Sequence, residues 1–323
     1  MGEEPTDHSA HGSHGSTRAV LAALAANLGI AVSKLVGFLI TGSASMLAEA
    51  IHSTADSGNQ GLLLLGGKRA RKEADERHPF GYGRERYFWA FVVALVLFAL
   101  GGAFAIVEGV EKIREPHELE SAGVAIAILG AAVVMEGLSF RTAVGEANRV
   151  REGVPWFQFI RRSRNPELPV VLLEDFGALV GLAFALTGVT LAEITGDAVW
   201  DGISTLAIGL LLSALAIVLA VEMKSLLLGE SATRSVEAAI RHAIGADDQV
   251  EELIHLRTEH LGPEEVLVGA KVSFLGDLSV AQLAHAIDRV EAGVRTAVPS
   301  ARIIYIEPDV YRSGDVADGG AGA

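Results

Sequence analysis

Long apolar segments dominate the first two-thirds of the sequence. Six of them contain few charged residues and are long enough to cross about 30 Å of hydrocarbon as helices. They cover residues 19–41, 45–66, 87–110, 121–143, 169–190 and 199–223. This pattern predicts an all-α, six-helix transmembrane bundle over residues 17–225.

The last third of the sequence has a different pattern. Helical spacing of apolar residues over 235–244 and 279–298 alternates with period-two spacing over 250–258, 266–274 and 302–306. The predicted order is helix, strand, strand, helix, strand, with one apolar face per element. Such an order is typical of a small α+β domain of the ferredoxin-like kind, which we expect over residues 226–312.

The two ends of the chain are polar or rich in glycine and alanine. Residues 1–16 carry His8, His11 and His14, and residues 313–323 have few large apolar side chains. Neither segment can bury enough apolar surface to offset the entropy that ordering would cost. We therefore expect a disordered, His-containing tail at one end and a disordered tail at the other.

Basic residues distinguish the two sides of the predicted bundle. Those in the connections after the second and fourth spans are Lys68, Arg69, Arg71, Lys72, Arg77, Arg84, Arg86, Arg149, Arg151, Arg161, Arg162 and Arg164. The alternate connections carry only Lys112 and Arg114. Because cytoplasmic loops hold the excess of Lys and Arg, we expect both basic connections and both termini in the cytoplasm. The membrane we expect is the plasma membrane.

Composition restricts the chemistry. The chain of 323 residues has no cysteine, which excludes disulfides and thiolate metal sites and leaves nitrogen and oxygen as metal ligands. Its formal net charge of −14 argues against nucleic acid as a partner, because phosphate binding requires a basic surface. A metal site, if present, must therefore be built from His, Asp and Glu.

A line of polar residues crosses the second predicted span. It consists of Ser45, Glu49, His52, Asp56 and Asn59. At about 100° per residue, these positions fall within about 80° of one another on one helix face. Ionisable side chains in a membrane span cost roughly 2.5 to 3.5 kcal/mol each on insertion. We therefore predict that this face points into the bundle.

His52 and Asp56 lie one helical turn apart, so both side chains can reach the same ion. An imidazole together with a carboxylate suits Zn²⁺ among the common divalent ions. The alternative is a buried hydrogen bond between His52 and Asp56 with no metal. Further carboxylates in other apolar spans favour the metal interpretation.

Two other predicted spans supply those carboxylates. Glu174 and Asp175 are adjacent in the fifth span, where two neighbouring carboxylates are costly to ionise without a cation. Glu136 lies in the middle of the fourth span, where it can join the site, hold a proton or pair with Lys34 of the first span. The candidate metal ligands are therefore His52, Asp56, Asp175, Glu174 and Glu136.

Asp197 and Asp201 stand at the start of the sixth predicted span. Carboxylates at this position commonly cap the N-terminus of their own helix. We interpret both residues as simple caps of the sixth span.

Two runs of residues carry a family resemblance. They are Gly42-Ser43-Ala44-Ser45-Met46-Leu47-Ala48-Glu49-Ala50-Ile51-His52-Ser53 with Asp56, and His78-Pro79-Phe80-Gly81-Tyr82-Gly83-Arg84. They resemble the cation diffusion facilitator family, and Leu172-Leu173-Glu174-Asp175 resembles a zinc-transporter branch of it. The resemblance extends from about residue 19 to residue 308. It implies six spans, a cytosolic ferredoxin-like domain, a homodimer, and exchange of metal for protons by alternating access.

The resemblance also assigns roles to individual positions. The family's metal-binding pair in the second span falls on His52 and Asp56, and the second residue of its pair in the fifth span falls on Asp175. The first residue of that pair falls on Val171, which cannot bind a metal. The fourth ligand is therefore Glu174, water or another carboxylate such as Glu136.

The C-terminal domain departs further from the family pattern. Positions at which many members bind regulatory zinc fall on Ile254, Lys271, Tyr305 and Glu307. A lysine repels a cation, and we interpret His255, His260 and His285 as isolated, solvated surface residues. No metal site is expected in this domain, and dimerisation is the role that the resemblance implies for it.

The predicted function is transport of a divalent cation, with Zn²⁺ first and Co²⁺, Fe²⁺ or Mn²⁺ as other possible ions. Protons compete with the ion for His and carboxylate ligands, so we expect metal/proton antiport that exports the ion from the cytoplasm. We expect no enzyme activity and no cofactor. Two alternatives stay open: an intramembrane metalloenzyme, because Glu49 and His52 share a helix face, and a membrane metal sensor or scaffold.

Overall fold

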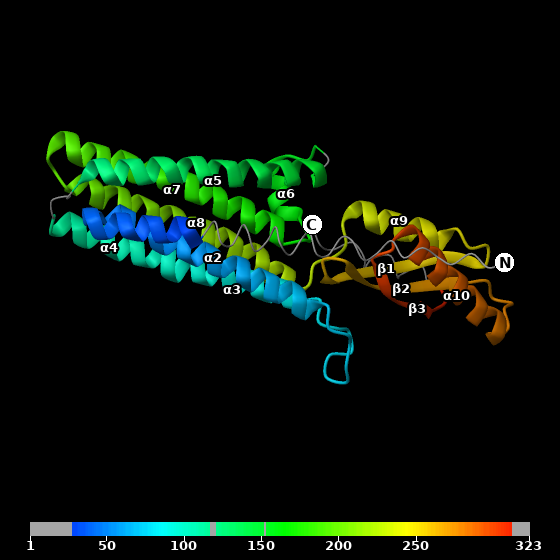
Figure 1. Ribbon diagram of the computed structural model, residues 1–323. Helices are drawn as coiled ribbons and strands as arrows, with labels where there is room; N and C mark the ends of the chain where they lie inside the picture. Colours follow the sequence, from blue (N-terminus) through cyan, green and yellow to red (C-terminus); the bar gives the residue numbers. More distant parts are fainter. Residues whose placement is uncertain (1–27, 117–120, 152, 312–323) are drawn as a thin grey trace, which may run out of the picture. The chain divides into compact units, whose positions relative to one another are not determined.

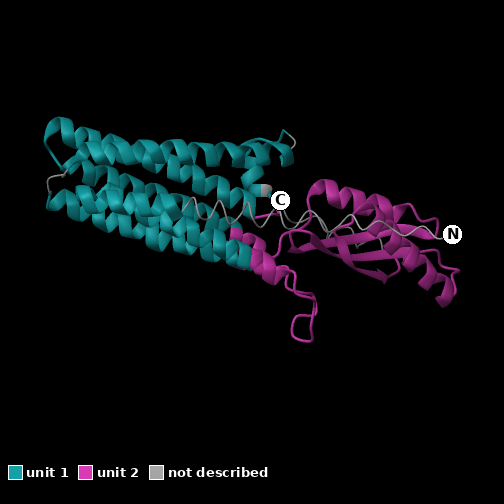
Figure 2. Ribbon diagram, in the orientation of Figure 1, with its two compact units in different colours: residues 1–65, 89–163, 167–222 teal, residues 66–88, 164–166, 223–323 magenta. Residues whose placement is uncertain are grey.

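The computed structural model describes residues 28–116, 121–151 and 153–311. The two predicted tails lie outside the described residues. The chain divides into two compact units (Figure 2). The first comprises residues up to 65, 89–163 and 167–222, and the second combines residues 66–88 and 164–166 with those from 223 onward.

Helices occupy all six positions at which the sequence predicts spans. They are Leu28–Thr41, α2 (Ala44–Ala70), a continuous helix over Glu85–Arg114, α5 (Ala122–Val150), α7 (Glu167–Thr195) and α8 (Val199–Leu228). The third of these consists of α3 (Glu85–Val96), a π-helical segment η1 (Leu97–Ala103) and α4 (Phe104–Arg114). A short helix before α7, α6 (Trp156–Arg162), has no counterpart in the predicted elements.

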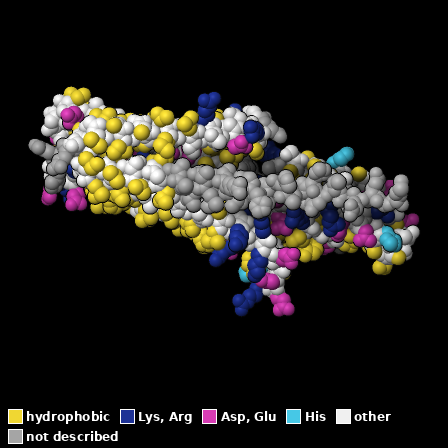
Figure 3. Space-filling model, viewed as in Figure 1, with side chains coloured by type: hydrophobic (Ala, Val, Ile, Leu, Met, Phe, Trp, Pro, Cys, Tyr) yellow, Lys and Arg dark blue, Asp and Glu magenta, His cyan; other side chains and the backbone are white. Residues whose placement is uncertain are grey.

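Four of the described helices are long and apolar enough to cross a membrane: Glu85–Arg114, Ala122–Val150, Glu167–Thr195 and Val199–Leu228. The helix Leu28–Thr41 is apolar but shorter over its described residues, and α2 carries the polar line. We call the first unit the helical unit, and hydrophobic side chains cover much of its visible surface (Figure 3). Many large hydrophobic residues of this unit are exposed, among them Val107 and Leu210. Such a surface is suited to lipid. The protein is a mostly helical, multi-pass membrane protein.

Small residues allow the spans to approach closely. A Cβ atom added at Gly109 of α4 would lie 2.5 Å from the backbone nitrogen of Leu206, and one added at Gly209 of α8 would lie 2.6 Å from the nitrogen of Ile106. Glycine at both positions therefore brings α4 and α8 into backbone contact, as is common in membrane helix pairs. The neighbouring pair α5 and α7 also runs side by side (Figure 1).

The second unit contains the small α+β fold expected from the sequence. Its elements are α9 (Arg234–Gly245), β1 (Val250–Gly262), β2 (Glu265–Phe274), α10 (Val280–Ala297) and β3 (Ala301–Pro308). Strand β2 lies in the centre of the sheet, antiparallel to β1 and parallel to β3. The parallel pair requires a crossover, which α10 provides.

Both helices of this unit contribute to one hydrophobic core with β2. Its most buried members include Ile240, Ile244, Val268, Val272, Val290 and Val294. Alternate residues of β2 point into this core, in agreement with the period-two spacing of the sequence. Side chains cap both helices: Thr233 accepts a hydrogen bond at the start of α9, and Ser279 with Gln282 forms a capping box at the start of α10.

The loop after α2 packs against the end of β1 within the second unit. A Cβ atom added at Gly83 would lie 2.6 Å from the carbonyl oxygen of Leu261, so only glycine permits this approach. The next residue, Arg84, forms an ion pair with Glu259. The second basic connection is held in the same unit, because Arg164 pairs with Glu230.

Candidate metal-binding site

The polar line of α2 faces the interior of the helical unit, as the sequence predicts. The side chains of Ser45, Glu49, His52 and Asn59 are fully buried, and that of Asp56 is 15% exposed. Between them, apolar or small residues of α2 occupy other faces of the helix. The helical period of 3.6 residues therefore accounts for the shared orientation of these five side chains.

His52 and Asp56 are neighbours, but they do not satisfy each other. The Nδ1 atom of His52 lies 3.5 Å from Oδ1 of Asp56. Among the residues that the structure describes, neither ring nitrogen of His52 has a hydrogen-bond partner, and Oδ1 of Asp56 has none either. The hydrogen bond that the sequence left open as an alternative is thus not formed. Buried polar atoms without partners are rare, and three of them together indicate a place for a ligand.

The two adjacent carboxylates of α7 each have a polar neighbour from a different helix. Asn59 of α2 donates a hydrogen bond of 2.7 Å to Oε1 of Glu174. Ser139 of α5 donates one of 3.0 Å to Oδ2 of Asp175. Both carboxylates are buried, with Glu174 4% and Asp175 9% exposed. These hydrogen bonds fix the orientation of the two side chains and leave the second oxygen of each available.

The candidate ligands gather in one region without closing around a single point. The hydrogen bond between Asn59 and Glu174 brings α7 beside the part of α2 that carries Asp56. Within residues 28–116, 121–151 and 153–311, however, no group of three or more His, Asp or Glu side chains is spaced to hold a metal ion. His52 and Asp56 have side-chain atoms 3.5 Å apart in the described conformation.

Glu136 has a cationic neighbour, which is one of the alternatives left open by the sequence. Nζ of Lys34 lies 4.0 Å from Oε1 of Glu136. The closest carboxylate to Lys34 is nevertheless Glu49 of α2, at 3.1 Å from Oε2. Sequence reasoning missed this partner, although Glu49 and Lys34 are both charged residues in apolar spans.

Asp201 caps a different helix from the one predicted. Its carboxylate accepts hydrogen bonds from the start of α2, with the hydroxyl of Ser43 at 2.8 Å and the backbone nitrogen of Ala44 at 2.7 Å. The backbone nitrogen and the hydroxyl of Ser45 donate to Oδ1 as well. We call these four residues the Asp201 cap. Asp197, in contrast, accepts from the nitrogen of Val199 at the start of its own helix, as predicted.

The C-terminal positions discussed above hold a lysine salt bridge. Nζ of Lys271 lies 3.0 Å from Oδ2 of Asp309 and 3.3 Å from Oε1 of Glu307. Hydrogen bonds to Asp309 and Glu307 raise the pKa of Lys271 above its ordinary value. His260 is buried rather than solvated, so that part of the prediction is wrong: Nδ1 of its ring lies 3.3 Å from the carbonyl oxygen of Gly262.

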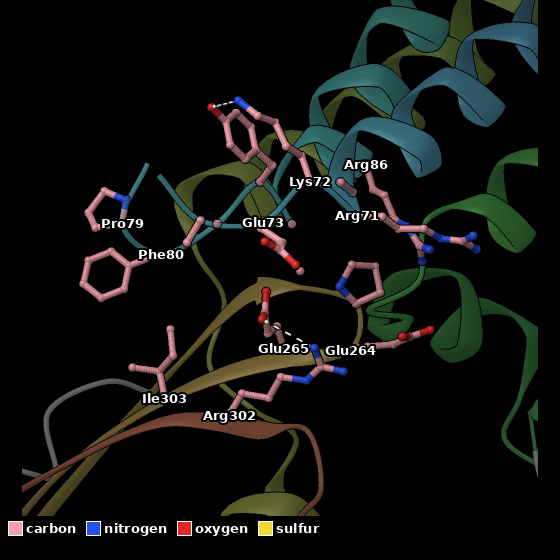
Figure 4. A pocket seen from close by; sticks show the side chains of 17 residues that line it. Arg71, Lys72, Glu73, Pro79, Phe80, Arg86, Glu264, Glu265, Arg302 and Ile303 are labelled. Atoms are coloured by element: carbon pink, nitrogen blue, oxygen red, sulfur yellow. Dashed lines mark hydrogen bonds and ion pairs between the residues drawn. The ribbon is translucent and has the colours of Figure 1, made fainter. Parts of the chain in front are cut away.

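A cavity of about 430 Å³ in the second unit contains none of the candidate ligands (Figure 4). The charged residues that line it are Arg71, Lys72, Glu73, Arg86, Glu264, Glu265 and Arg302. Arg302 forms an ion pair of 3.9 Å with Glu265, and Lys72 donates a hydrogen bond to Tyr82, as the dashed lines mark. Four basic side chains outnumber three carboxylates around this cavity, a balance that does not favour a divalent cation.

Comparison with known proteins identifies relatives of this chain. Proton-coupled zinc antiporter SLC30A9, mitochondrial, from Mus musculus is 31% identical over 75% of this chain and 43% of that protein. The protein of the same name from Homo sapiens is 32% identical over the same shares. Metal tolerance protein C4 from Arabidopsis thaliana is 29% identical over 73% of this chain and 52% of that protein. The chain thus spans about half the length of these curated relatives.

The C-terminal part of the chain has a weak structural match to the C-terminal domain of a MamM variant in its nickel form. The match is 18% identical, covers 25% of this chain and 100% of that one, and has a TM-score of 0.24. The predicted plasma-membrane location gains no support from the relatives, because the name of the SLC30A9 proteins describes those proteins as mitochondrial.

Residues 20–228 match the family model of the cation efflux transmembrane domain. This match covers well over half of the chain and confirms the family that the motifs in the second span and its loop predicted. The members of the family are transporters rather than enzymes, which excludes the alternative of an intramembrane metalloenzyme. The chain belongs to the cation efflux family.

Proposed function

We propose that this protein transports Zn²⁺ across a membrane in exchange for protons, with His52, Asp56, Asp175 and Glu174 as the residues that bind the ion during transport. One observation carries this proposal. Both ring nitrogens of His52 are completely buried and have no hydrogen-bond partner among the described residues, and Oδ1 of the adjacent Asp56 is in the same situation. A coordinated cation would satisfy one ring nitrogen of His52 and Oδ1 of Asp56, since neutral imidazole and ionised carboxylate are metal ligands.

The available donors favour zinc. A chain without cysteine offers only nitrogen and oxygen, and His52 supplies nitrogen within the helical unit. Imidazole with carboxylates suits Zn²⁺ and Co²⁺, whereas oxygen donors alone suit Mg²⁺ and Mn²⁺. The SLC30A9 relatives bear the name of zinc antiporters, which supports the same choice of ion.

Proton exchange follows from the chemistry of these ligands. An imidazole that binds metal must lose its proton on that nitrogen, and a carboxylate ligand must be ionised, so protons and metal compete for the same atoms. A site that opens to each side in turn would release the ion where protons are abundant. The name of the SLC30A9 relatives, which describes those proteins as proton-coupled, supports this exchange.

A ligand set of four candidates needs the helices to move. Asp175 and Glu174 lie on α7, and His52 and Asp56 lie on α2, so a small displacement between these helices would bring the donors around one ion. Glu136 is the weaker candidate, because Lys34 already lies beside it. Three protein ligands with an exchangeable fourth position would suit a carrier, which must release the ion it binds.

The proposal includes the topology and assembly implied by the family resemblance. Six helices would cross the membrane, and a homodimer would form through the C-terminal domain. Both basic connections are joined to the C-terminal domain by ion pairs, one between Arg84 and Glu259 and one between Arg164 and Glu230. These pairs support a location of both connections on one side of the membrane. The excess of basic residues assigns that side to the cytoplasm.

The test is ion uptake into proteoliposomes with an imposed pH gradient. Purified protein should accumulate Zn²⁺ only when the gradient is present, and the uptake should be accompanied by proton movement in the opposite direction. Mn²⁺ offered at the same concentration should enter more slowly. Zinc binding without any flux would contradict transport and would favour the alternative of a membrane metal sensor.

A further inference from the structure

A buried lysine lies directly beside the candidate ion-binding residues. Lys34, on the helix Leu28–Thr41, is 0% exposed, although lysine is almost never completely buried without a partner. Its Nζ atom donates hydrogen bonds to Oε2 of Glu49 at 3.1 Å and to Oγ of Ser53 at 2.7 Å. Glu136 of α5 lies 4.0 Å away. One ammonium group therefore interacts with two carboxylates and a hydroxyl from two other helices.

The position of these partners on α2 is specific. Glu49 lies three residues before His52, and Ser53 directly follows it. Lys34 thus binds α2 on both sides of His52 along the helix. These contacts restrict rotation of α2 about its axis and keep His52 and Asp56 directed into the helical unit. Lys34 consequently positions His52 and Asp56 without contacting the atoms that would bind the ion.

Charge gives Lys34 a second effect. Glu49 and Glu136 are oxygen donors in a region of low polarity, and a carboxylate there requires a cation close by. Lys34 supplies that cation covalently. Oε1 of Glu49 has no hydrogen-bond partner in the described part of the chain, so this carboxylate could accept another cation if Lys34 were replaced by a neutral residue. The ammonium group therefore excludes mobile cations from these two carboxylates.

We propose that Lys34 is a built-in counter-cation that determines ion specificity: it engages Glu49 and Glu136 and so confines the transported ion to His52, Asp56 and the carboxylates of α7. This inference rests on the proposed function and adds to it a positioning residue outside the ligand set. Without Lys34, oxygen ligands become available beside the ion site. Harder ions such as Mn²⁺ prefer such ligands, so they would compete better with Zn²⁺.

The experiment compares competitive uptake of Mn²⁺ and Zn²⁺ into proteoliposomes by Lys34→Gln and by the unmodified protein. The expected result is a rise of about tenfold in the Mn²⁺/Zn²⁺ uptake ratio, carried by a lower half-saturating Mn²⁺ concentration rather than by a higher maximal rate. The double variant Lys34→Gln/Glu49→Gln removes the carboxylate that Lys34 hydrogen-bonds and leaves only Glu136, which lies 4.0 Å from Lys34 in the unmodified protein. The ratio should therefore return to within about twofold of the original.

Lys112→Gln is the matched control. Lys112 is also a buried lysine of the helical unit, 7% exposed, but its Nζ atom contacts only the carbonyl oxygen of Gly42 at 3.5 Å among the contacts described. Its replacement should leave the ion ratio unchanged. An unchanged ratio in folded Lys34→Gln as well would overturn the proposal.

Failure of Lys34→Gln to fold would still leave a decisive comparison. The double variant lacks the charge of Glu49, the closer of the two carboxylates that Lys34 compensates, so it should fold better than Lys34→Gln and transport Zn²⁺ with nearly the original selectivity. A double variant that is as unstable as Lys34→Gln would contradict the role of counter-cation. The unmodified protein in the same vesicles separates the two proposals. If it takes up no Zn²⁺, the proposed transport function is wrong. If it takes up Zn²⁺ normally and Lys34→Gln has no effect on the ion ratio, only the inference about Lys34 is wrong.

Discussion

Two buried polar side chains along helix α2 differ in how they are satisfied. At the N-terminal end of α2, the carboxylate of Asp201 from α8 accepts hydrogen bonds from two hydroxyls and two backbone nitrogens. About two turns further along α2, the imidazole of His52 has no hydrogen bond to any described residue. The cap at the end of the helix is complete, as a structural element should be. The middle of the helix is incomplete, which is typical of a site that awaits a ligand.

The contrast between the complete cap and the incomplete ion site predicts the largest loss of transport for a substitution of Asp56. Asp56→Asn removes a negative charge that would compensate the ion, so Zn²⁺ uptake into proteoliposomes should fall by about a hundredfold or more. The thermal stability of the variant should not decrease, because a neutral amide is no costlier to bury than an unpaired carboxylate. Uptake within about threefold of the original would show that Asp56 lies outside the ion site.

Asp201→Ala should have the opposite profile. Its loss leaves four buried donors without an acceptor, which should lower the free energy of unfolding by about 2 to 3 kcal/mol. Zn²⁺ uptake per folded molecule should stay within about threefold, since the cap does not touch the ion. The measurements are thermal unfolding in detergent and uptake normalised to folded protein. A variant that is stable but inactive would assign Asp201 to transport and remove the contrast.

The extent to which sequence predicted these features depended on the range of the interactions. Apolar length located all six helices, and period-two spacing located the strands, because both depend on local burial. The interior orientation of His52 likewise followed from its position on one helix face. The partners of Asp201, and the pairing of Lys34 with Glu49, could not be predicted in this way. Asp201 contacts residues more than 150 positions earlier in the chain, and only the packing of α8 against α2 brings them together.

The π-helical segment and the burial of His260 were missed for related reasons. No local signal separates η1 from the α-helix on either side, and the close approach of α8 at Gly102 is visible only in three dimensions. His260 lies beyond the predicted strand 250–258 but within β1 as it forms, and we interpreted it as an isolated surface histidine. Its ring is instead enclosed by the chain around Gly262, with an exposed fraction of 6%.

The smallest predicted effect concerns this histidine in the C-terminal unit. Burial lowers the pKa of His260 below its ordinary value of 6.5. The unfolded chain therefore binds a proton below about pH 6.5 while the folded chain does not, so the stability of the domain should fall as the pH drops below that value and stay constant above it. The slope should not exceed about 1.4 kcal/mol per pH unit, and His260→Gln should reduce it.

This local effect can be measured by hydrogen exchange of residues 250–262, at steps of about one pH unit between about pH 5 and pH 8. The exchange rates must be corrected for their intrinsic pH dependence. An identical pH dependence in His260→Gln would attribute the slope to other groups.

The most direct test of the account is competitive uptake of Zn²⁺ and Mn²⁺ by His52→Asp, with His52→Ala beside it. His52 is the buried nitrogen donor of the candidate site, and Asp keeps a ligand at the same distance from Asp56 along α2. We predict that His52→Asp still transports but loses about tenfold of its preference for Zn²⁺, whereas His52→Ala loses transport of both ions. An unchanged ion ratio in an active His52→Asp variant would mean that the unpartnered nitrogens of His52 do not bind the ion.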